Sequence, residues 1–205
     1  MKSILLVGGG GHCRACIDVI EAVGGIQIVG IVQPRDAGSL PVLGYPVLGG
    51  DEDLPSLLPG VSSALVAIGQ IKSPSIRINL FELLKRFGVE MPPIISPKAY
   101  CSRHASVGQG SIVMHGAVVN ALAQIGENCI INSQALLEHD AVVGANCHIA
   151  TGARVNGGVR IGAASFVGSG AILREGICVG KGVVIGAGRL VLSDVPDGAI
   201  LKGGE

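Results

Sequence analysis

The feature that most restricts the fold of this chain is a six-residue period in its second half. Every sixth residue from Val107 to Val191 gives fifteen positions, and each of them holds Val, Ile or Leu. A strand repeats its buried side every 2 residues and a helix every 3.6, so neither produces an unbroken period of six. Four residues after each aliphatic residue the side chain is mostly small, as at Ala117, Cys129 and Ala141.

This period predicts a parallel β-helix. In such a repeat each hexad forms one short strand and a turn, and three hexads close one triangular coil. The aliphatic residue points inward, and the small residue leaves room for it. The pattern extends from Ile95 to Leu190, which corresponds to about five coils. The 33 glycines fit a backbone with many turns, because no low-complexity tract accompanies them.

The first half alternates strand and helix patterns. Short apolar runs predict strands over 3–9, 26–32 and 64–69, and apolar residues at helical spacing predict helices over 12–24 and 75–88. Parallel strands joined by helices, with glycines after the first strand, indicate a small Rossmann-like α/β domain. The stretch "MPPIISP" interrupts this pattern. We therefore expect one domain over 1–92 and a second over 93–205.

The overall composition excludes several classes of function. The formal net charge is zero, which gives no electrostatic argument for binding nucleic acid or an anionic membrane. The apolar runs are too short to span a bilayer, and no signal peptide is recognisable. Six scattered cysteines without a secretory context indicate reduced thiols. We expect a cytoplasmic protein with neither nucleic acid nor membrane as a partner.

An acid–imidazole cluster interrupts the apolar repeat. Glu138, His139 and Asp140 lie between two inward positions, on a turn of the predicted coil, and His148 follows nine residues after His139. A neutral imidazole can accept a proton near pH 7, and a neighbouring carboxylate can hold its tautomer. The cluster therefore indicates acid–base catalysis. The alternative is a solvated polar corner without a function.

The repeat resembles the hexapeptide-repeat acyltransferases, whose fold is a left-handed β-helix and whose active unit is usually a trimer with acyl-CoA bound between adjacent helices. The stretch "NSQALLEHDAVVGANCHIATGARVNGGVRIG" is similar to a bacterial subfamily of sugar acetyltransferases. This subfamily includes sialic acid O-acetyltransferases and nucleotide-linked 4-amino-sugar N-acetyltransferases. Its members also carry a small α/β domain before the β-helix, so the resemblance covers nearly the whole chain.

The resemblance implies roles for single residues in the β-helix. His139 would be the general base and Asp140 the acid that orients it, while His148 would lie near the acetyl carbonyl of acetyl-CoA. Gly157 would offer a backbone N–H to the thioester oxygen, although it could also serve only to let the coil turn. Asn132 is a secondary candidate for acceptor binding. We otherwise interpret it, like Asn120, as a turn residue with left-handed φ.

The glycine-rich loop "GGGGH" invites a dinucleotide-binding interpretation that fits poorly. The third glycine of the fingerprint is missing, and Gln33 stands where a ribose-binding acid is expected. By resemblance, Gly9, Gly11, His12 and Gly69 would instead line the site of a nucleotide sugar. A tight strand–helix turn is the alternative. Redox or metal chemistry at the C-x-x-C pair Cys13 and Cys16 has little support, because no second pair exists.

The sequence thus predicts an acetyl-CoA-dependent acetyltransferase that acts on the amino group of a nucleotide-linked amino sugar. We expect direct attack on acetyl-CoA, a homotrimer, and no metal. O-acetylation of sialic acid or a related sugar is the closest alternative. Two further hypotheses are a trimeric scaffold without catalysis and a zinc enzyme of the carbonic anhydrase type, which would need three converging histidines.

Overall fold

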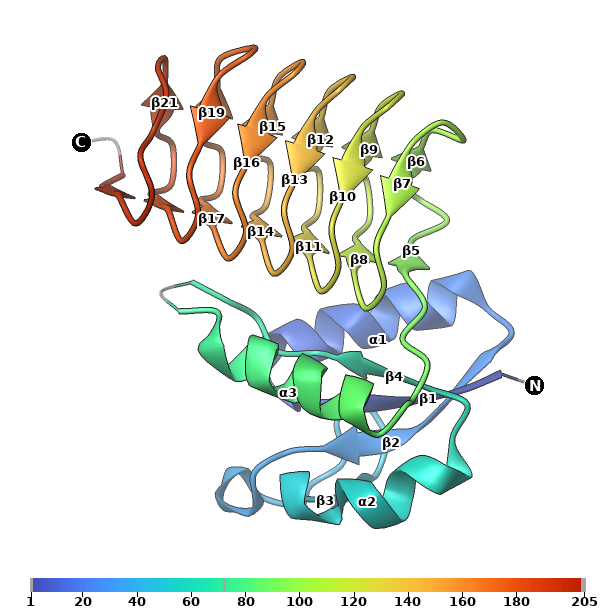
Figure 1. Cartoon of the computed structure of the whole chain (residues 1–205). Coiled ribbons are helices and arrows are strands. Elements are labelled where there is room, and N and C mark those ends of the chain that lie inside the picture. The colour runs from blue at the N-terminus through green and yellow to red at the C-terminus, as the bar shows by residue number, and fades with distance from the viewer. Residues whose placement is uncertain (1, 72, 204–205) are drawn as a thin grey trace. The chain divides into compact units, whose positions relative to one another are not determined.

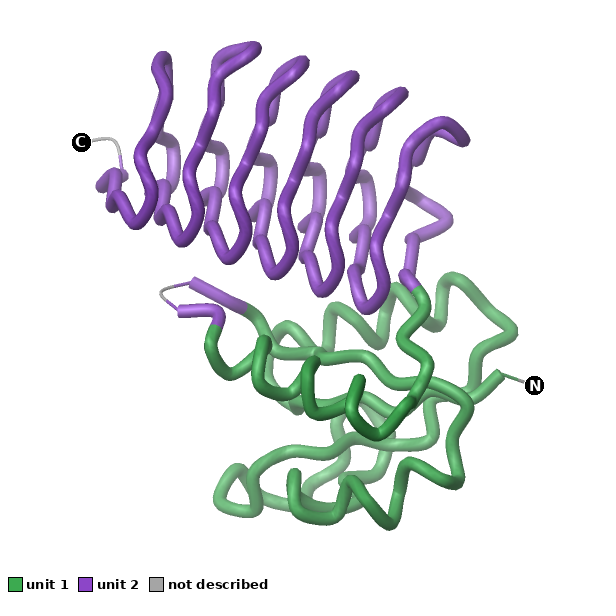
Figure 2. The backbone as a smooth tube through the Cα atoms, viewed as in Figure 1, with its two compact units in different colours: residues 1–69, 75–92 green, residues 70–74, 93–205 purple. Residues whose placement is uncertain are grey.

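The computed structural model describes residues 2–71 and 73–203. The chain divides into two compact units, which Figure 2 shows in different colours. The first unit contains residues 1–69 and 75–92, and the second contains residues 70–74 and 93–205. The short segment 70–74 therefore groups with the second unit, although it lies between two elements of the first.

The first unit is a parallel sheet with helical connections (Figure 1). Its described strands are β1 (Lys2–Val7), β2 (Ile26–Val32), β3 (Val47–Gly49) and β4 (Ser63–Val66), in the order β3-β2-β1-β4. Its helices are α1 (Gly11–Val23), α2 (Leu54–Leu57) and α3 (Ser75–Arg86), with 3-10 turns η1 (Arg35–Ala37), η2 (Asp51–Asp53) and η3 (Leu58–Gly60). The predicted Rossmann-like fold is confirmed. β3 and α2 were not predicted from the sequence, because three or four residues are too few to show a hydrophobic period.

The core of this unit forms where the sheet meets its helices. β1 is buried from Ile4 to Val7, as a parallel strand covered on both faces should be. Leu5 and Val7 share a buried cluster with Leu80 and Phe81 of α3. Side chains that follow the helical period bury the inner side of α1: Cys13, Cys16, Ile17, Val19 and Ile20.

The second unit is a parallel β-helix of two-residue strands, whose coils Figure 1 shows side by side. Within the described residues they form sheets of five, seven and six strands. They are β5 (Ile94–Ile95), β6 (Tyr100–Cys101), β7 (Ser106–Val107), β8 (Ile112–Val113), β9 (Val118–Val119), β10 (Gln124–Ile125), β11 (Ile130–Ile131), β12 (Leu136–Leu137), β13 (Val142–Val143), β14 (His148–Ile149), β15 (Arg154–Val155), β16 (Arg160–Ile161), β17 (Phe166–Val167), β18 (Ile172–Leu173), β19 (Cys178–Val179), β20 (Val184–Ile185), β21 (Leu190–Val191) and β22 (Ile200–Leu201).

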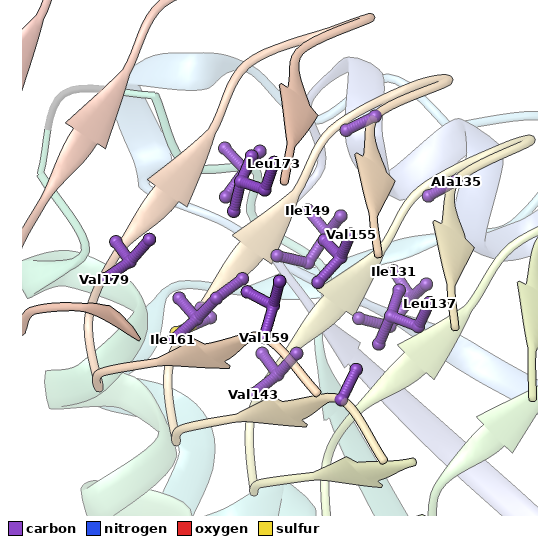
Figure 3. Close-up of a cluster of buried hydrophobic side chains, with 14 of the residues drawn as sticks. Ile131, Ala135, Leu137, Val143, Ile149, Val155, Val159, Ile161, Leu173 and Val179 are labelled. Carbon is purple, nitrogen blue, oxygen red and sulfur yellow. The ribbon is translucent and has the colours of Figure 1, made fainter. Parts of the chain in front are cut away.

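Strands three hexads apart pair in register, so residues 18 positions apart stack on one another. Leu137 pairs with Val155, and Val155 pairs with Leu173. These side chains fill the interior of the coils together with the small residues between them (Figure 3). The predicted inward positions are confirmed, because Val113, Leu137 and Val155 are fully buried.

In each hexad that begins between Val107 and Ile185, the chain turns through a residue with positive φ, three positions after the aliphatic residue. Glycine occupies many of these positions, such as Gly110 and Gly116, and Asn128 and Asp140 occupy others. The interpretation of Asn120 and Asn132 as left-handed turn residues is wrong, because their φ values are not positive. They lie two positions before the left-handed residue of their hexads.

No helix among the described residues is both long enough and apolar enough to cross a membrane.

Candidate active site

The catalytic pair predicted from the sequence is formed at one turn of the β-helix. Asp140 has a φ of 60°, and its side chain reaches back so that Oδ2 lies 2.8 Å from Nδ1 of His139. A carboxylate can only accept a hydrogen bond, so the proton of a neutral imidazole stands on Nδ1. Nε2 then carries a free lone pair. Both side chains are more than half exposed, at 67% and 56%, so the base is open to a substrate.

A second carboxylate supports the same turn. Glu138 Oε2 accepts a hydrogen bond of 2.8 Å from Nδ2 of Asn120, one coil earlier, and another of 3.3 Å from the main-chain N–H of His139. Asn120 therefore holds Glu138, and Glu138 holds the backbone of the base. This role cannot be read from Asn120 by itself, and the stacking interval of 18 residues is the sequence signal that points to it.

Gly157 stacks on His139 in the next coil. A Cβ atom at residue 157 would lie 2.7 Å from both Cε1 and Nε2 of the imidazole. The main-chain N–H of Gly158 donates to the carbonyl of His139 at 2.9 Å, which fixes the two turns relative to each other. In the described part of the chain, no protein group accepts the N–H of Gly157. A base and an available N–H donor thus lie side by side.

His148 is bound on both sides. Its Nδ1 lies 2.6 Å from the carbonyl oxygen of Gln70, and its Nε2 lies 3.2 Å from Nδ2 of Asn132. Because a carbonyl can only accept, Nδ1 carries the proton, and Nε2 accepts from Asn132. The ring is only 7% exposed and packs edge-on against Phe166, with centroids 5.3 Å apart. The structure therefore joins two predicted site residues, His148 and Asn132, in one hydrogen-bonded unit.

The predicted acceptor residues of the first unit lie around the start of α1. Gly10 is the N-cap of this helix and makes no side-chain cap hydrogen bond, and the N-terminus of a helix is an end that favours an anion. His12 lies opposite Gly69, since a Cβ atom there would be 3.5 Å from Cβ of His12. Gly9 lies against Gln33, the residue at the position where a ribose-binding acid is expected in a dinucleotide fold. Gly11 is exposed, with open space at its Cα.

The described residues contain no set of side chains that could bind a metal ion. No group of three or more His, Cys, Asp or Glu side chains is placed to hold an ion. The zinc hypothesis would need His148, whose two ring nitrogens are both engaged in hydrogen bonds. The pair Cys13 and Cys16 is buried and unlinked. Burial raises the pKa of the Cys13 thiol to about 11.

Two families match the chain. The PglD N-terminal domain family matches residues 3–84, and the bacterial transferase hexapeptide family, which consists of six repeats, matches residues 122–157. A comparison of the sequence with curated proteins gives no match.

Several solved structures are similar to the whole chain. The acetyltransferase domain of PglB from Neisseria gonorrhoeae is 34% identical, with a TM-score of 0.92 over 98% of this chain and 96% of that one. In complex with acetyl coenzyme A, the same domain matches at 35% identity and a TM-score of 0.89, over 97% of this chain and 95% of that one. A third structure is a histidine-to-asparagine variant of perosamine N-acetyltransferase from Caulobacter crescentus, in complex with CoA and GDP-perosamine. It is 33% identical, with a TM-score of 0.91 over 98% of this chain and 93% of that one.

The left-handed β-helix and its exposed imidazole–carboxylate pair define a hexapeptide-repeat acetyltransferase. With a PglD-type domain before the β-helix and whole-chain similarity to sugar acetyltransferases, the chain belongs to the PglD family of bacterial sugar acetyltransferases. The resemblance inferred from the sequence is confirmed.

Proposed function

We propose that the protein transfers the acetyl group of acetyl-CoA to the amino group of a nucleotide-linked amino sugar. The observation that carries this proposal is the open Nε2 of His139, held in its tautomer by Asp140 and facing Gly157. The similar PglB domain binds acetyl coenzyme A, and the similar perosamine enzyme binds CoA and GDP-perosamine. These likenesses support the choice of both substrates.

The chemistry follows from this geometry. The sugar amine attacks the thioester carbon while Nε2 of His139 accepts the proton that the amine loses. The negative charge that develops on the acetyl oxygen would be received by the N–H of Gly157. Collapse forms the amide N–C bond and breaks the C–S bond, and the proton on Nε2 passes to the departing CoA thiolate. Asp140 stabilises the imidazolium that exists between these two proton transfers.

The two units would divide the substrates between them. We propose that residues 93–205 hold acetyl-CoA and the catalytic pair, and that residues 1–92 bind the acceptor through Gly9, Gly11, His12 and Gly69. The start of α1 would suit a phosphate of the acceptor, because the N-terminus of a helix favours an anion. His148, proposed near the acetyl carbonyl, and Asn132, proposed on the acceptor side, would act together because they are hydrogen bonded to each other.

A homotrimer in the cytoplasm would complete this proposal. Ile172 and Leu190 are paired outward residues of the β-helix, and both are exposed, at 37% and 54%. Such an apolar outer surface suits contact with another copy of the chain. All six cysteines are free, which suits a reducing compartment. Analytical ultracentrifugation would test the trimer.

The decisive experiment measures CoA release from acetyl-CoA with a panel of acceptors. The panel contains UDP- and GDP-linked 4-amino sugars, free sialic acid and CMP-sialic acid, and it compares the wild type with His139→Asn. We expect turnover on a nucleotide amino sugar and a loss of about 10²–10⁴-fold in kcat in the variant. His104→Asn is the matched control, because His104 is an exposed histidine of the same unit.

The panel also separates the alternatives. Turnover on sialic acid alone would replace the N-acetyltransferase proposal with O-acetylation at the same site. Binding of acetyl-CoA without turnover on any acceptor would contradict the proposed acceptor class. A trimer that neither binds acetyl-CoA nor releases CoA would be a scaffold.

A further inference from the structure

The turn after β15 contains the only Asn–Gly dipeptide of the sequence, Asn156–Gly157. Asparagine is a thermolabile residue, and a following glycine makes it most reactive, because no side chain hinders attack by the glycine nitrogen. The attack closes a succinimide ring and releases ammonia, which deamidates the asparagine. In a folded protein this reaction requires a free glycine nitrogen, a free side-chain amide and a main chain that can rotate.

The nitrogen of Gly157 is free. In the described part of the chain no protein group accepts its N–H, and the residue is half-buried. The dipeptide Asp197–Gly198, in the turn before β22, shows the opposite arrangement. The N–H of Gly198 donates to the carbonyl of Lys181 at 2.8 Å, and Oδ1 of Asp197 accepts the N–H of Lys181 at 2.8 Å. Both reacting groups are therefore engaged in that turn, whereas the nitrogen of Gly157 is open to react.

The side-chain amide of Asn156 is free as well. Among the described residues, no group forms a hydrogen bond with it. The other asparagines of the β-helix are bound through their side chains: Asn120 to Glu138, Asn128 to Asn146, and Asn132 to His148. Asn156 is thus the one described asparagine of the β-helix whose side chain can turn towards its own main chain.

The main chain is held loosely at Asn156. Its N–H donates to the carbonyl of Leu173 at 3.4 Å, whereas the corresponding bond is 2.9 Å long at the residues that stack in the same row, Asn120, Glu138 and Arg174. The carbonyl of Asn156 accepts the N–H of Val159 at 3.3 Å. The peptide unit between Asn156 and Gly157 is therefore restrained by one long hydrogen bond, because its own N–H is unused.

His139 lies where a base for this reaction is needed. A Cβ atom at residue 157 would be 2.7 Å from Nε2 of His139, so the imidazole lies against Gly157. The hydrogen bond to Asp140 keeps the proton on Nδ1 and leaves the lone pair of Nε2 available. The side chain of His139 is 67% exposed, so it can adjust towards the N–H of Gly157. A base positioned in this way typically accelerates a proton transfer by about 10²–10⁴-fold.

We propose that Asn156 deamidates in the folded protein and that His139 acts as the base. Nε2 accepts the proton of the Gly157 N–H while the nitrogen attacks Cγ of Asn156. The N–Cγ bond forms, the Cγ–Nδ2 bond breaks, and the imidazolium returns the proton to the departing nitrogen, which leaves as ammonia. Water then opens the succinimide at either carbonyl and yields aspartate or isoaspartate. The reaction needs neither acetyl-CoA nor an acceptor, so it does not rest on the proposed function.

Deamidation changes the catalytic turn. Isoaspartate lengthens the main chain before Gly157 by one methylene, and either product adds a carboxylate at the position that stacks on Glu138. The N–H of Gly157 then moves relative to the imidazole, and misplacement on the scale of 1 Å can cost about 10²-fold in rate. We therefore expect molecules with isoaspartate at residue 156 to lose acetyl transfer, so that the protein ages through its own base.

Incubation of the full chain at neutral pH, followed by tryptic mapping, tests the proposal. Cleavage after Arg154 and Arg160 releases residues 155–160 as one peptide, in which deamidation appears as the mass change from NH to O. We expect the wild type to deamidate there at least about tenfold faster than His139→Asn, because the positioned base is lost. A sample digested at time zero corrects for deamidation during digestion, and residue 139 lies in a different tryptic peptide.

Two further variants isolate the structural conditions. Asn156→Gln should remain unmodified, since its longer side chain would have to close a larger ring. Asp197→Asn places the same dipeptide where the N–H of Gly198 is bound. It should deamidate at least about tenfold more slowly than Asn156, because a hydrogen bond must first be broken. Thermal midpoints establish that each variant is folded.

The outcomes separate the parts of the proposal. Equal rates in wild type and His139→Asn would overturn the role of His139. An unmodified wild type, after an incubation that deamidates the synthetic peptide of residues 155–160, would overturn the site. Full CoA release by the deamidated protein would contradict its inactivation. A wild type that deamidates through His139 but acetylates no amino sugar would contradict only the proposed function.

Discussion

Gly157 lies one coil beyond His139 and approaches the imidazole so closely that a Cβ atom would be 2.7 Å from Nε2. The 18-residue stacking of the β-helix places the two residues on one another, and the Gly158–His139 hydrogen bond holds the turns together. The lone pair of the base and the N–H of Gly157 therefore share one small space. The absence of a side chain at residue 157 leaves room for the imidazole in this position.

Replacing Gly157 by alanine should damage catalysis more than folding. The methyl group would displace the imidazole from its position, and misplacement on the scale of 1 Å can cost about 10²-fold in rate. The exposed His139 can swing aside, so the thermal midpoint should change little. Steady-state kinetics and thermal unfolding of Gly157→Ala check both expectations. In a His139→Asn background the same alanine should cost less than about twofold, because coupled residues are not additive.

Asp140→Asn should lower kcat by roughly 10–10²-fold while the fold is preserved. The substitution removes the negative charge that stabilises the imidazolium. Asparagine tolerates the left-handed backbone here, because Asn128 and Asn146 occupy equivalent positions with φ of 52° and 62°. The kcat of this variant, beside its thermal midpoint, is the measurement. Wild-type kcat in a folded variant would mean that Asp140 does not orient the base.

A polar ladder at one corner of the β-helix predicts a tolerated core substitution. Ser111, Cys129, Cys147 and Ser165 stack at intervals of 18 residues, and each donates to a carbonyl of a glycine 15 residues ahead, at 2.8–3.2 Å. Cys147→Ser should therefore lower the free energy of unfolding by less than about 1 kcal/mol, because the new hydroxyl can donate to the same carbonyl as the thiol, that of Gly162. Chemical or thermal unfolding measures this difference.

Ala141→Ser is the matched control for this ladder. Ala141 is also a fully buried small residue at a corner, but the carbonyl of Asn156, 15 residues ahead, already accepts the N–H of Val159 at 3.3 Å. A new hydroxyl at residue 141 competes for that acceptor and should cost about 1–3 kcal/mol. Equal costs for the two serine variants would contradict the explanation by hydrogen bonding.

Thiol alkylation should distinguish buried from exposed cysteines. The thiolate is the reactive form, and burial raises the pKa of Cys13 to about 11 and raises the pKa of Cys16 further. Both thiols should therefore stay protonated and unmodified by iodoacetamide at pH 8, whereas the exposed Cys178 reacts. Peptide mapping by mass spectrometry reads out each site, and the unfolded chain serves as the positive control. Rapid modification of Cys13, or a disulfide between Cys13 and Cys16, would restore a redox role for this pair.

Much of the fold was predictable because its repeat appears in the sequence as one aliphatic residue at every sixth position. Each hexad of a β-helix must supply one aliphatic side chain to the interior, so residues such as Val113, Leu137 and Val155 recur at a fixed interval. The α/β unit was also predictable where its elements are long, as in α1 and α3. It was missed at β3, where three residues cannot reveal a period.

The candidate site divides in a similar way. The pairing of His139 with Asp140 joins adjacent residues, and their chemistry can be read from the sequence. The hydrogen bond from Asn120 to Glu138 joins two adjacent coils, so predicting it requires knowing which residues stack on one another. The wrong assignment of Asn120 and Asn132 to left-handed turns arose because their place within the hexad was misjudged by two positions.

The sequence by itself therefore determined the β-helix, the α/β unit before it and the adjacent imidazole and carboxylate that we propose as the catalytic pair. The tertiary structure decided which partners surround these groups: Gly157 beside His139, the carbonyl of Gln70 on His148, and Gln33 against Gly9. The physical reason is that local periodicity encodes burial, which every hexad repeats. A contact with a backbone carbonyl or with a glycine arises only when distant turns pack together. The types of the residues involved do not predict such a contact.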